Sequence, residues 1–321
     1  MKKDVKKAMS FKEVMTSYGT FFALLLVIVV FGALNPRVFL SSTNFWNITR
    51  QMVILAIISL GTTLIMSVEE FDLSVGTIAS FSGVLSAILA INGVPFFWAM
   101  MIAFVLSGII GFLNGFIVTR FKVMSFIITL AMSRVIYGVT YWLSDGAIVF
   151  NKIPESFKFI GTAKLGPIPY LTFLMVIAIL IFHYITKSTS LGRKFYAIGG
   201  NEQASQVAGI KVSKYKTIAF TIAGAMSGLA GVLLASRVGS AAPTGGDAYC
   251  LNAYATIFIG KTVFKEGIPN IPGTVVGVAL FTILANGLTI MQVPTFVQNI
   301  LTGLVIVIAV ISQKLGSKEN E

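Results

Sequence analysis

The sequence predicts an all-α integral membrane protein with about ten transmembrane helices. Hydrophobic residues make up 56% of the 321-residue chain and charged residues only 11%, and the mean hydropathy is +0.88. A soluble domain carries roughly a quarter charged residues. Apolar segments approaching the roughly 20 residues that a membrane-crossing helix needs recur along the whole chain. We therefore expect one transmembrane domain over residues 1–321.

The candidate spans are separated by short polar connections. The third and eighth fit the expected span least well, so each is a candidate for a short or partly re-entrant element. The approximate ranges are 18–34, 48–68, 73–91, 96–119, 124–144, 168–186, 217–236, 248–262, 272–291 and 295–312.

The distribution of Lys and Arg orients these spans. With this hydropathy, the net charge of +12 reflects cations collecting in cytoplasmic loops and does not indicate nucleic-acid binding. The basic N-terminus, residues 1–17, and the polar stretch 187–216 fall on one side of the membrane when six spans separate them. The connection 145–167 is then external, where Asp145 and Glu155 partly balance its lysines. We expect both termini in the cytoplasm.

Short motifs recur in the two halves of the chain. Asn114-Gly115 ends the fourth span, and Asn286-Gly287 ends the ninth. The predicted topology makes these two spans cross in opposite directions. Spans 2–5 and 7–10 are therefore predicted to form an inverted repeat, a frequent transporter design with the pathway at the repeat interface. Chance similarity between Gly-rich apolar segments is the alternative.

The acidic segment Glu69-Glu70-Phe71-Asp72-Leu73-Ser74 separates the second and third spans. Carboxylates near or inside a membrane are costly and often mark function. Asp72 and Ser74 are candidates to cap the following helix, because such side chains accept bonds from free amides at a helix start. A solvated cytoplasmic turn with ordinary capping is the alternative. No Lys or Arg lies nearby in the sequence to pair with the glutamates.

Polar residues inside or beside other spans are further candidates. A buried Arg134 would need a partner or a water-filled cavity, and the alternative is that its side chain extends to the membrane surface. Asn114 and Asn286 can bond either a polar solute or a neighbouring helix. Arg237 and Asp247 flank a predicted external turn, which suits contact with an extracytoplasmic partner.

The sequence contains no recognisable catalytic constellation. A single cysteine, Cys250, excludes an internal disulfide, and with a single histidine, His183, it argues against zinc or haem sites. The Gly-rich phosphate loop of ATPases is also missing, so an ATP-driven process would need a separate ATPase chain. We expect no enzyme activity, no metal site and no cofactor in this chain.

Several ordered motifs resemble those of the membrane permease subunits of ribose-type ABC sugar importers. Asp72-Leu73-Ser74-Val75-Gly76 reproduces the Asp-Leu-Ser-Val-Gly signature of that family. Further similar elements are Asn114-Gly115, Phe126-Ile127-Ile128-Thr129-Leu130, residues 199–210, Gly273-Thr274 and Asn286-Gly287. Two elements depart from the pattern. Glu69-Glu70 replaces a usual Gly pair, and Tyr249-Cys250-Leu251-Asn252 replaces a frequent Tyr-Glu-Leu-Asp.

This resemblance implies a homodimeric or heterodimeric permease in the bacterial cytoplasmic membrane. An extracytoplasmic solute-binding protein would deliver a monosaccharide such as ribose, and a cytoplasmic ATPase subunit that uses ATP would drive alternating access. Residues 187–216 would form the cytoplasmic coupling loop. The expected ATPase-coupling residues are Gly200, Glu202, Ala204 and Gly209, and the expected pathway residues are Asp72, Ser74, Asn114, Phe126 and Asn286.

Two other functions stay open at this point. The first is an ABC permease for another solute: a nucleoside, a quorum-signal sugar or a branched-chain amino acid. The second is a proton-coupled secondary transporter that uses Glu69, Glu70 and Asp72 as proton carriers. Co-purification of an ATPase would separate these two classes.

Overall fold

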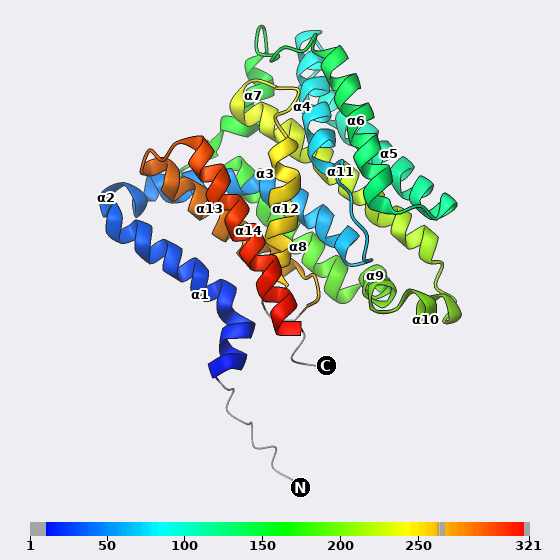
Figure 1. The fold of residues 1–321 in the computed structure, drawn as a ribbon. Coiled ribbons are helices and arrows are strands. Elements are labelled where there is room, and N and C mark those ends of the chain that lie inside the picture. The colour runs from blue at the N-terminus through cyan, green and yellow to red at the C-terminus, as the bar shows by residue number, and fades with distance from the viewer. Residues whose placement is uncertain (1–10, 262, 264–266, 318–321) are drawn as a thin grey trace.

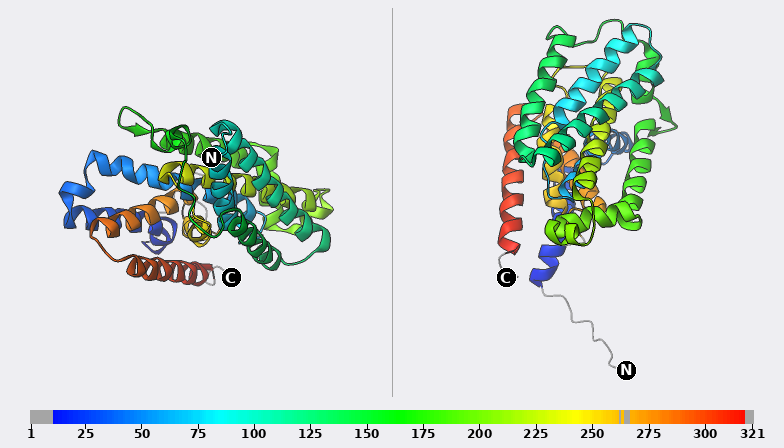
Figure 2. Two further views of the ribbon diagram at one scale, coloured as in Figure 1. Left: turned by 90° about the horizontal axis from the view of Figure 1, so that it is seen from above. Right: turned by 90° about the vertical axis from the view of Figure 1, so that its right-hand side faces the viewer.

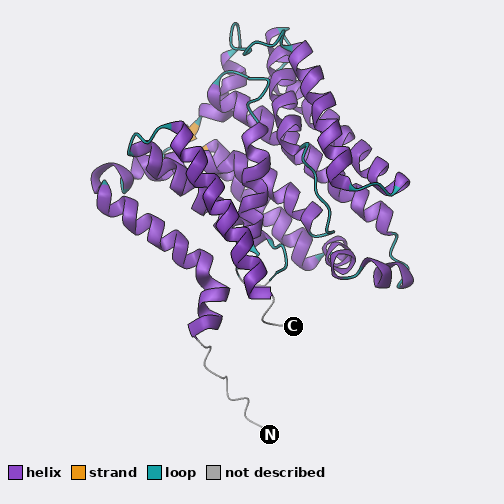
Figure 3. Cartoon of the chain, viewed as in Figure 1, coloured by secondary structure: helices purple, strands orange, loops and turns teal. Residues whose placement is uncertain are grey.

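The computed structural model describes residues 11–261, 263 and 267–317. Residues 1–10 of the predicted basic N-terminus, and residues 318–321 of the C-terminal tail, lie outside the described residues. Helices dominate the described part of the chain (Figure 1, Figure 3). The all-α prediction for a membrane chain is therefore confirmed.

The helices of the first half are α1 (Phe11–Leu34), α2 (Pro36–Phe39), α3 (Ser42–Met66), α4 (Val75–Ile91), α5 (Phe96–Phe121), α6 (Ser125–Leu143) and α7 (Glu155–Thr162). Those of the second half are α8 (Tyr170–Ser188), α9 (Ser190–Gly200), α10 (Glu202–Val207), α11 (Val212–Val238), α12 (Asp247–Gly260), α13 (Ile271–Ile290) and α14 (Thr295–Ser317). Between α7 and α8, strand β1 (Lys164–Leu165) pairs antiparallel with β2 (Ile168–Pro169).

Each predicted span overlaps one helix, but the helices differ in length. Among the described residues, six are long and apolar enough to cross a membrane: α3, α5, α6, α8, α11 and α13. Helices α4 and α12 have 17 and 14 residues, or about 25 and 21 Å at 1.5 Å per residue. Both are shorter than the roughly 30 Å hydrocarbon core of a bilayer. The ten-span count and the inverted repeat stay predictions.

The centre of the bundle is formed by α3 and α11. Their most apolar stretches are 78% and 67% buried, against 22–28% for α5, α6 and α8. Apolar side chains such as Val135 and Leu180 remain exposed on those outer helices, as expected of lipid-facing surfaces. Helix α14 lies along one edge of the bundle (Figure 2).

The polar stretch 187–216 is mostly helical instead of an open loop. It comprises the end of α8, then α9 and α10, and the first turn of α11. Helices α9 and α10 lie at the same end of the bundle as the start of α1 and the end of α14, and α7 lies at the other end (Figure 1). The orientation predicted from the charges stays a prediction.

Candidate functional site

Residues 67–74 form a non-helical connection between α3 and α4, and we call them the break segment. Asp72 Oδ1 accepts hydrogen bonds from the backbone amide of Ser74 at 2.8 Å and from its hydroxyl at 2.5 Å. Ser74 is the residue before α4, but its own side chain makes no capping bond. The expectation that both residues cap α4 therefore needs correction, because Asp72 holds the turn and Ser74 is held by it.

Three of the expected pathway residues meet here, two from the break segment and one from α5. Asp72, Ser74 and Asn114 are fully buried, and Asn114 Nδ2 donates to the Ser74 hydroxyl at 2.8 Å. Within the described residues, Asp72 Oδ2 and Asn114 Oδ1 are buried without a hydrogen-bond partner. Buried polar atoms of this kind are few in folded proteins and call for an explanation.

Two neighbouring helices and one of its own side chains hold the backbone of the break segment. The backbone amides of residues 71–74 each donate to a side-chain oxygen, which satisfies backbone that no helix pairs. The acceptors, in order, are Ser125 on α6, Tyr254 on α12, Thr129 on α6 and Asp72 itself. The Tyr254 hydroxyl also donates to the Asp72 carbonyl at 3.1 Å. Sequence reasoning missed Ser125 and Tyr254, because neither is near the segment along the chain.

The two remaining expected pathway residues do not join this cluster. Phe126 follows Ser125 at the start of α6, and its side chain is 49% exposed. Asn286 on α13 exchanges two hydrogen bonds of 3.1 Å with Asn44 on α3. The side chain of Asn286 therefore bonds a neighbouring helix, which was the alternative to bonding a polar solute.

The residues expected to contact an ATPase gather on one exposed turn. Gly200, Glu202, Ala204 and Gly209 are all exposed. Asn201 caps α10, with Oδ1 accepting from the Ala204 amide at 2.8 Å. A short helix with a fixed start and an open surface is suited to docking against another protein.

Lys216 joins this exposed turn to the break segment. Its Nζ lies 2.6 Å from Glu70 Oε1 and 2.8 Å from Glu202 Oε2. No Lys or Arg lies near the glutamates in the sequence, and the cation that pairs with Glu70 is Lys216, 146 residues away. A second link is steric. A Cβ atom at Gly199 would overlap the carbonyl oxygen of Ser67, so α9 packs directly on the backbone of the break segment.

Comparison with known proteins shows that the chain is similar to membrane permeases. Residues 44–310 match the family described as branched-chain amino acid transport system / permease component. The ribose import permease RbsC of Bacillus subtilis is 36% identical over 97% of each chain, and the D-allose transport system permease AlsC of Escherichia coli is 34% identical over 98% of this chain and 96% of AlsC. The RbsC protein of Haemophilus influenzae is 34% identical over 94% of each chain.

A solved structure shares the fold. An inward-facing conformation of a metal-chelate type ABC transporter aligns with a TM-score of 0.53 at 14% identity, covering 91% of this chain and 96% of that one. The likeness in fold and the near full-length similarity to permeases agree with the six apolar helices. This chain is a multi-pass membrane protein that belongs to the branched-chain amino acid transport system / permease component family of ABC transporters.

Proposed function

We propose that this chain is the transmembrane permease subunit of an ABC importer for a monosaccharide of pentose or hexose size. The relatives at 34–36% identity are named for ribose and D-allose. The structural observation that carries the proposal is the bridge formed by Lys216, which connects an exposed docking helix to a buried polar break.

The bridge suggests how a partner could drive transport. In our proposal, residues 187–216 are the coupling segment and α10 contacts a cytoplasmic ATPase subunit, which binds and hydrolyses ATP. A shift of α10 would pull on Lys216 through Glu202 and act on Glu70 in the break segment. The break segment precedes α4 and is bonded to α6 and α12, so the shift would reach three helices together. ATP binding would thus favour one facing of the bundle over the other.

The opposite end of the bundle suits an extracytoplasmic solute-binding protein. Arg237 donates to the backbone carbonyl of Arg50 at 3.3 Å, and the two side chains border a cavity of about 230 Å³. Within the described residues, neither arginine forms a salt bridge. Acidic side chains of a partner would complement these two charges.

The proposal also covers the setting of the chain. It is a single transmembrane domain in the bacterial cytoplasmic membrane, with both termini in the cytoplasm, and it pairs with a second copy or a related permease. It carries no cofactor or metal and catalyses no reaction itself. Support for the orientation comes from the charge distribution and from the end of the bundle at which α9 and α10 lie.

The other functions have less support. The family description names branched-chain amino acids, but the relatives cited above are named for sugars. A proton carrier needs a carboxyl group that can gain and lose its proton along the pathway. Glu70 is held in a salt bridge by Lys216, and Glu69 is exposed, so only Asp72 of the three acids is buried in the bundle.

Reconstitution tests the proposed function. The chain is incorporated into liposomes with a candidate ATPase subunit and solute-binding protein from the same organism, and uptake of labelled ribose, allose and leucine is measured. We expect sugar accumulation that requires ATP and both partners, with no accumulation of leucine. Uptake that follows a proton gradient without the ATPase would contradict the proposal.

A further inference from the structure

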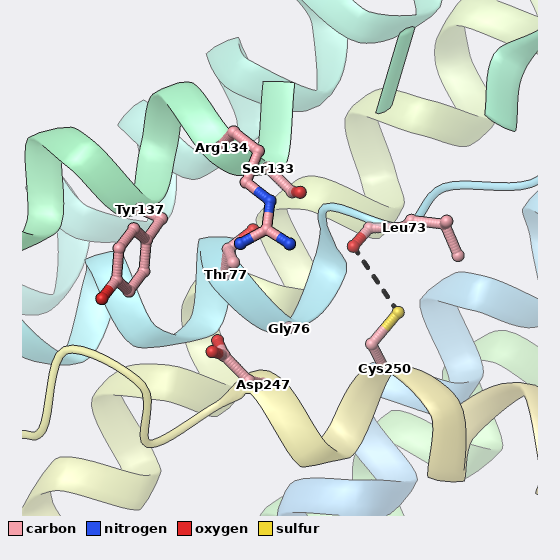
Figure 4. Close-up of a pocket in the computed structure, with 8 residues that line it drawn as sticks. All are labelled: Leu73, Gly76, Thr77, Ser133, Arg134, Tyr137, Asp247 and Cys250. Atoms are coloured by element: carbon pink, nitrogen blue, oxygen red, sulfur yellow. Dashed lines mark hydrogen bonds between the residues drawn. The ribbon is translucent and has the colours of Figure 1, made fainter. Parts of the chain in front are cut away.

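A polar cavity lies beside the break segment, where α4, α6 and α12 meet. Its volume is about 290 Å³, near the lower end of the roughly 300–1,000 Å³ typical of small-molecule pockets. The polar and charged side chains that line it are Thr77, Ser133, Arg134, Tyr137 and Asp247, and Leu73, Gly76 and Cys250 complete the lining (Figure 4).

Arg134 indicates that the cavity-facing side of α6 meets water or solute. The residue is nine positions from either end of the 19-residue helix, or about 14 Å along its axis, and its side chain is exposed. An arginine at that depth is costly against hydrocarbon and usually faces a water-filled cavity. Arg134 and Asp247 point toward one another across the cavity (Figure 4).

Arg134 and Asp247 do not form a salt bridge with each other. Among the described residues, no salt bridge within 4.0 Å joins Arg134 to a carboxylate. Asp247 Oδ1 accepts from the Ser80 hydroxyl at 3.1 Å, and no bond to Oδ2 is formed within the described part of the chain. Five guanidinium donors and a carboxylate oxygen are therefore available to a ligand between them.

The cavity also lies where two short helices start. The starts of α4 and α12 touch: a Cβ at Gly246 would overlap the Gly76 carbonyl oxygen, and one at Gly76 would lie 3.0 Å from the Asp247 carbonyl oxygen. Transporters commonly build their solute sites where helices are interrupted inside the membrane, with helix ends directed at the solute. Here the helix starts and the two charged side chains converge on one space.

We propose that this cavity is a solute subsite of the permease that binds one polyhydroxylated ring of pentose or hexose size. Arg134 donates to ring or hydroxyl oxygens, Asp247 accepts from neighbouring hydroxyls, and Tyr137 offers an aromatic face to the apolar side of the ring. Thr77 and Ser133 add hydroxyl groups. This inference rests on the proposed function and extends it to a specificity site within this chain.

An amino-acid zwitterion also has groups that match an arginine and a carboxylate. A branched-chain amino acid, however, needs an apolar pocket for its side chain. The lining residues that could supply one are Leu73 and Cys250, and the others are polar, aromatic or glycine. The cavity therefore favours a sugar, and an amino acid is the competing outcome of the test.

Equilibrium binding to the purified permease in lipid nanodiscs tests the subsite without either partner. Labelled ribose, allose and leucine are titrated against the wild type, Arg134→Ala and Asp247→Asn. Arg120→Ala and Asp145→Asn serve as matched controls at exposed positions outside the cavity. We expect both cavity variants to lose at least tenfold in sugar affinity and both controls to bind as the wild type does. Equal sugar binding by cavity variants and controls, or tight leucine binding, would overturn the subsite.

Two further measurements guard against misfolding and separate the two proposals. Arg134→Lys keeps the charge but loses the planar fork, so it should bind sugar with intermediate affinity. Thr77→Cys in a Cys250→Ala background should react with a maleimide and be protected by sugar, and an absence of protection counts against the subsite.

If the reconstituted transporter imports sugar equally well with and without Arg134, the subsite fails and the proposed function stands. If nanodisc binding behaves as expected but no ATP-driven uptake occurs, the proposed function fails and the subsite stands.

Discussion

Lys216 Nζ on α11 lies 2.6 Å from Glu70 Oε1 in the break segment. Both side chains are largely shielded, with exposed fractions of 11% and 14%. Lys216 also bonds Glu202, the first residue of α10, at 2.8 Å. One cation therefore holds two acids that belong to different functional parts of the chain.

Replacing this cation should uncouple ATP hydrolysis from transport. We expect Lys216→Met to lower sugar uptake per ATP hydrolysed by tenfold or more, because α10 loses its polar link to the break segment. The matched control is Lys214→Met, an exposed lysine on the same helix. The measurement is uptake and ATP hydrolysis in the same liposomes, and an unchanged ratio in Lys216→Met would contradict the coupling role.

The same substitution should destabilise the fold. The shielded charge-assisted bond to Glu70 contributes about 1.5–3 kcal/mol, and the pair with the more exposed Glu202 adds little, so Lys216→Met should lower the free energy of unfolding by about 2 kcal/mol. The double variant Glu70→Gln with Lys216→Met should recover part of the loss, since the shielded Glu70 carboxylate that lost its cation is then also removed. Thermal unfolding of the detergent-solubilised variants measures both effects.

Asp72 should be replaceable by Asn but not by Ala. Its Oδ1 accepts both bonds from Ser74, and an amide oxygen can do the same. The new amide group of Asp72→Asn would also add a donor to a cluster in which Asn114 Oδ1 has no partner. We expect Asp72→Asn to unfold at or above the wild-type temperature and Asp72→Ala to lose about 1–2 kcal/mol, as for a lost helix cap. A larger loss in Asp72→Asn would show that the cluster requires the carboxylate.

The helices and the turn at Asp72 could be predicted from the sequence because both follow from local patterns. Apolar runs predict helices, and Asp72-Leu73-Ser74 is a recognisable turn before a helix. The cluster partner Asn114 was identified as one member of a repeated motif. The short lengths of α4 and α12 were also foreshadowed, since their segments fit a span least well.

The tertiary pairings could not be predicted. Lys216 lies 146 residues from Glu70, and Tyr254 lies 182 residues from Asp72. Single-sequence patterns contain no information on such contacts, which depend on how the helices pack. Asn286 shows the same limit: its motif resembles that of Asn114, yet α13 turns it toward Asn44 and away from the break segment.

Glu69 carries backbone strain that a glycine would remove. Its φ is +57°, in the left-handed region that favours glycine, and the resemblance to the sugar permeases also gives a Gly pair at this position. We expect Glu69→Gly to be about 1 kcal/mol more stable than Glu69→Ala, because both variants lack the carboxylate and only alanine keeps the Cβ. Equal unfolding temperatures for the two variants would show that the turn is not strained.

Val207 should anchor the ATPase on α10. Its side chain is 91% exposed at the last position of the helix, next to the expected coupling residues Ala204 and Gly209. An apolar side chain held out at the tip of a capped polar helix gains most from entering a partner's pocket, where burial contributes about 1.5–3 kcal/mol.

We therefore expect Val207→Asp to abolish co-purification of the ATPase while leaving the unfolding temperature of the isolated permease unchanged, since no packing within the chain is lost. Val207→Ile should retain the ATPase because it keeps the apolar surface. Gln203→Ala, an exposed polar change on the same helix, is the control for a general disturbance of α10. Full retention of the ATPase by Val207→Asp would place the docking surface elsewhere in residues 187–216, and a lowered unfolding temperature would mean that Val207 contributes to the fold.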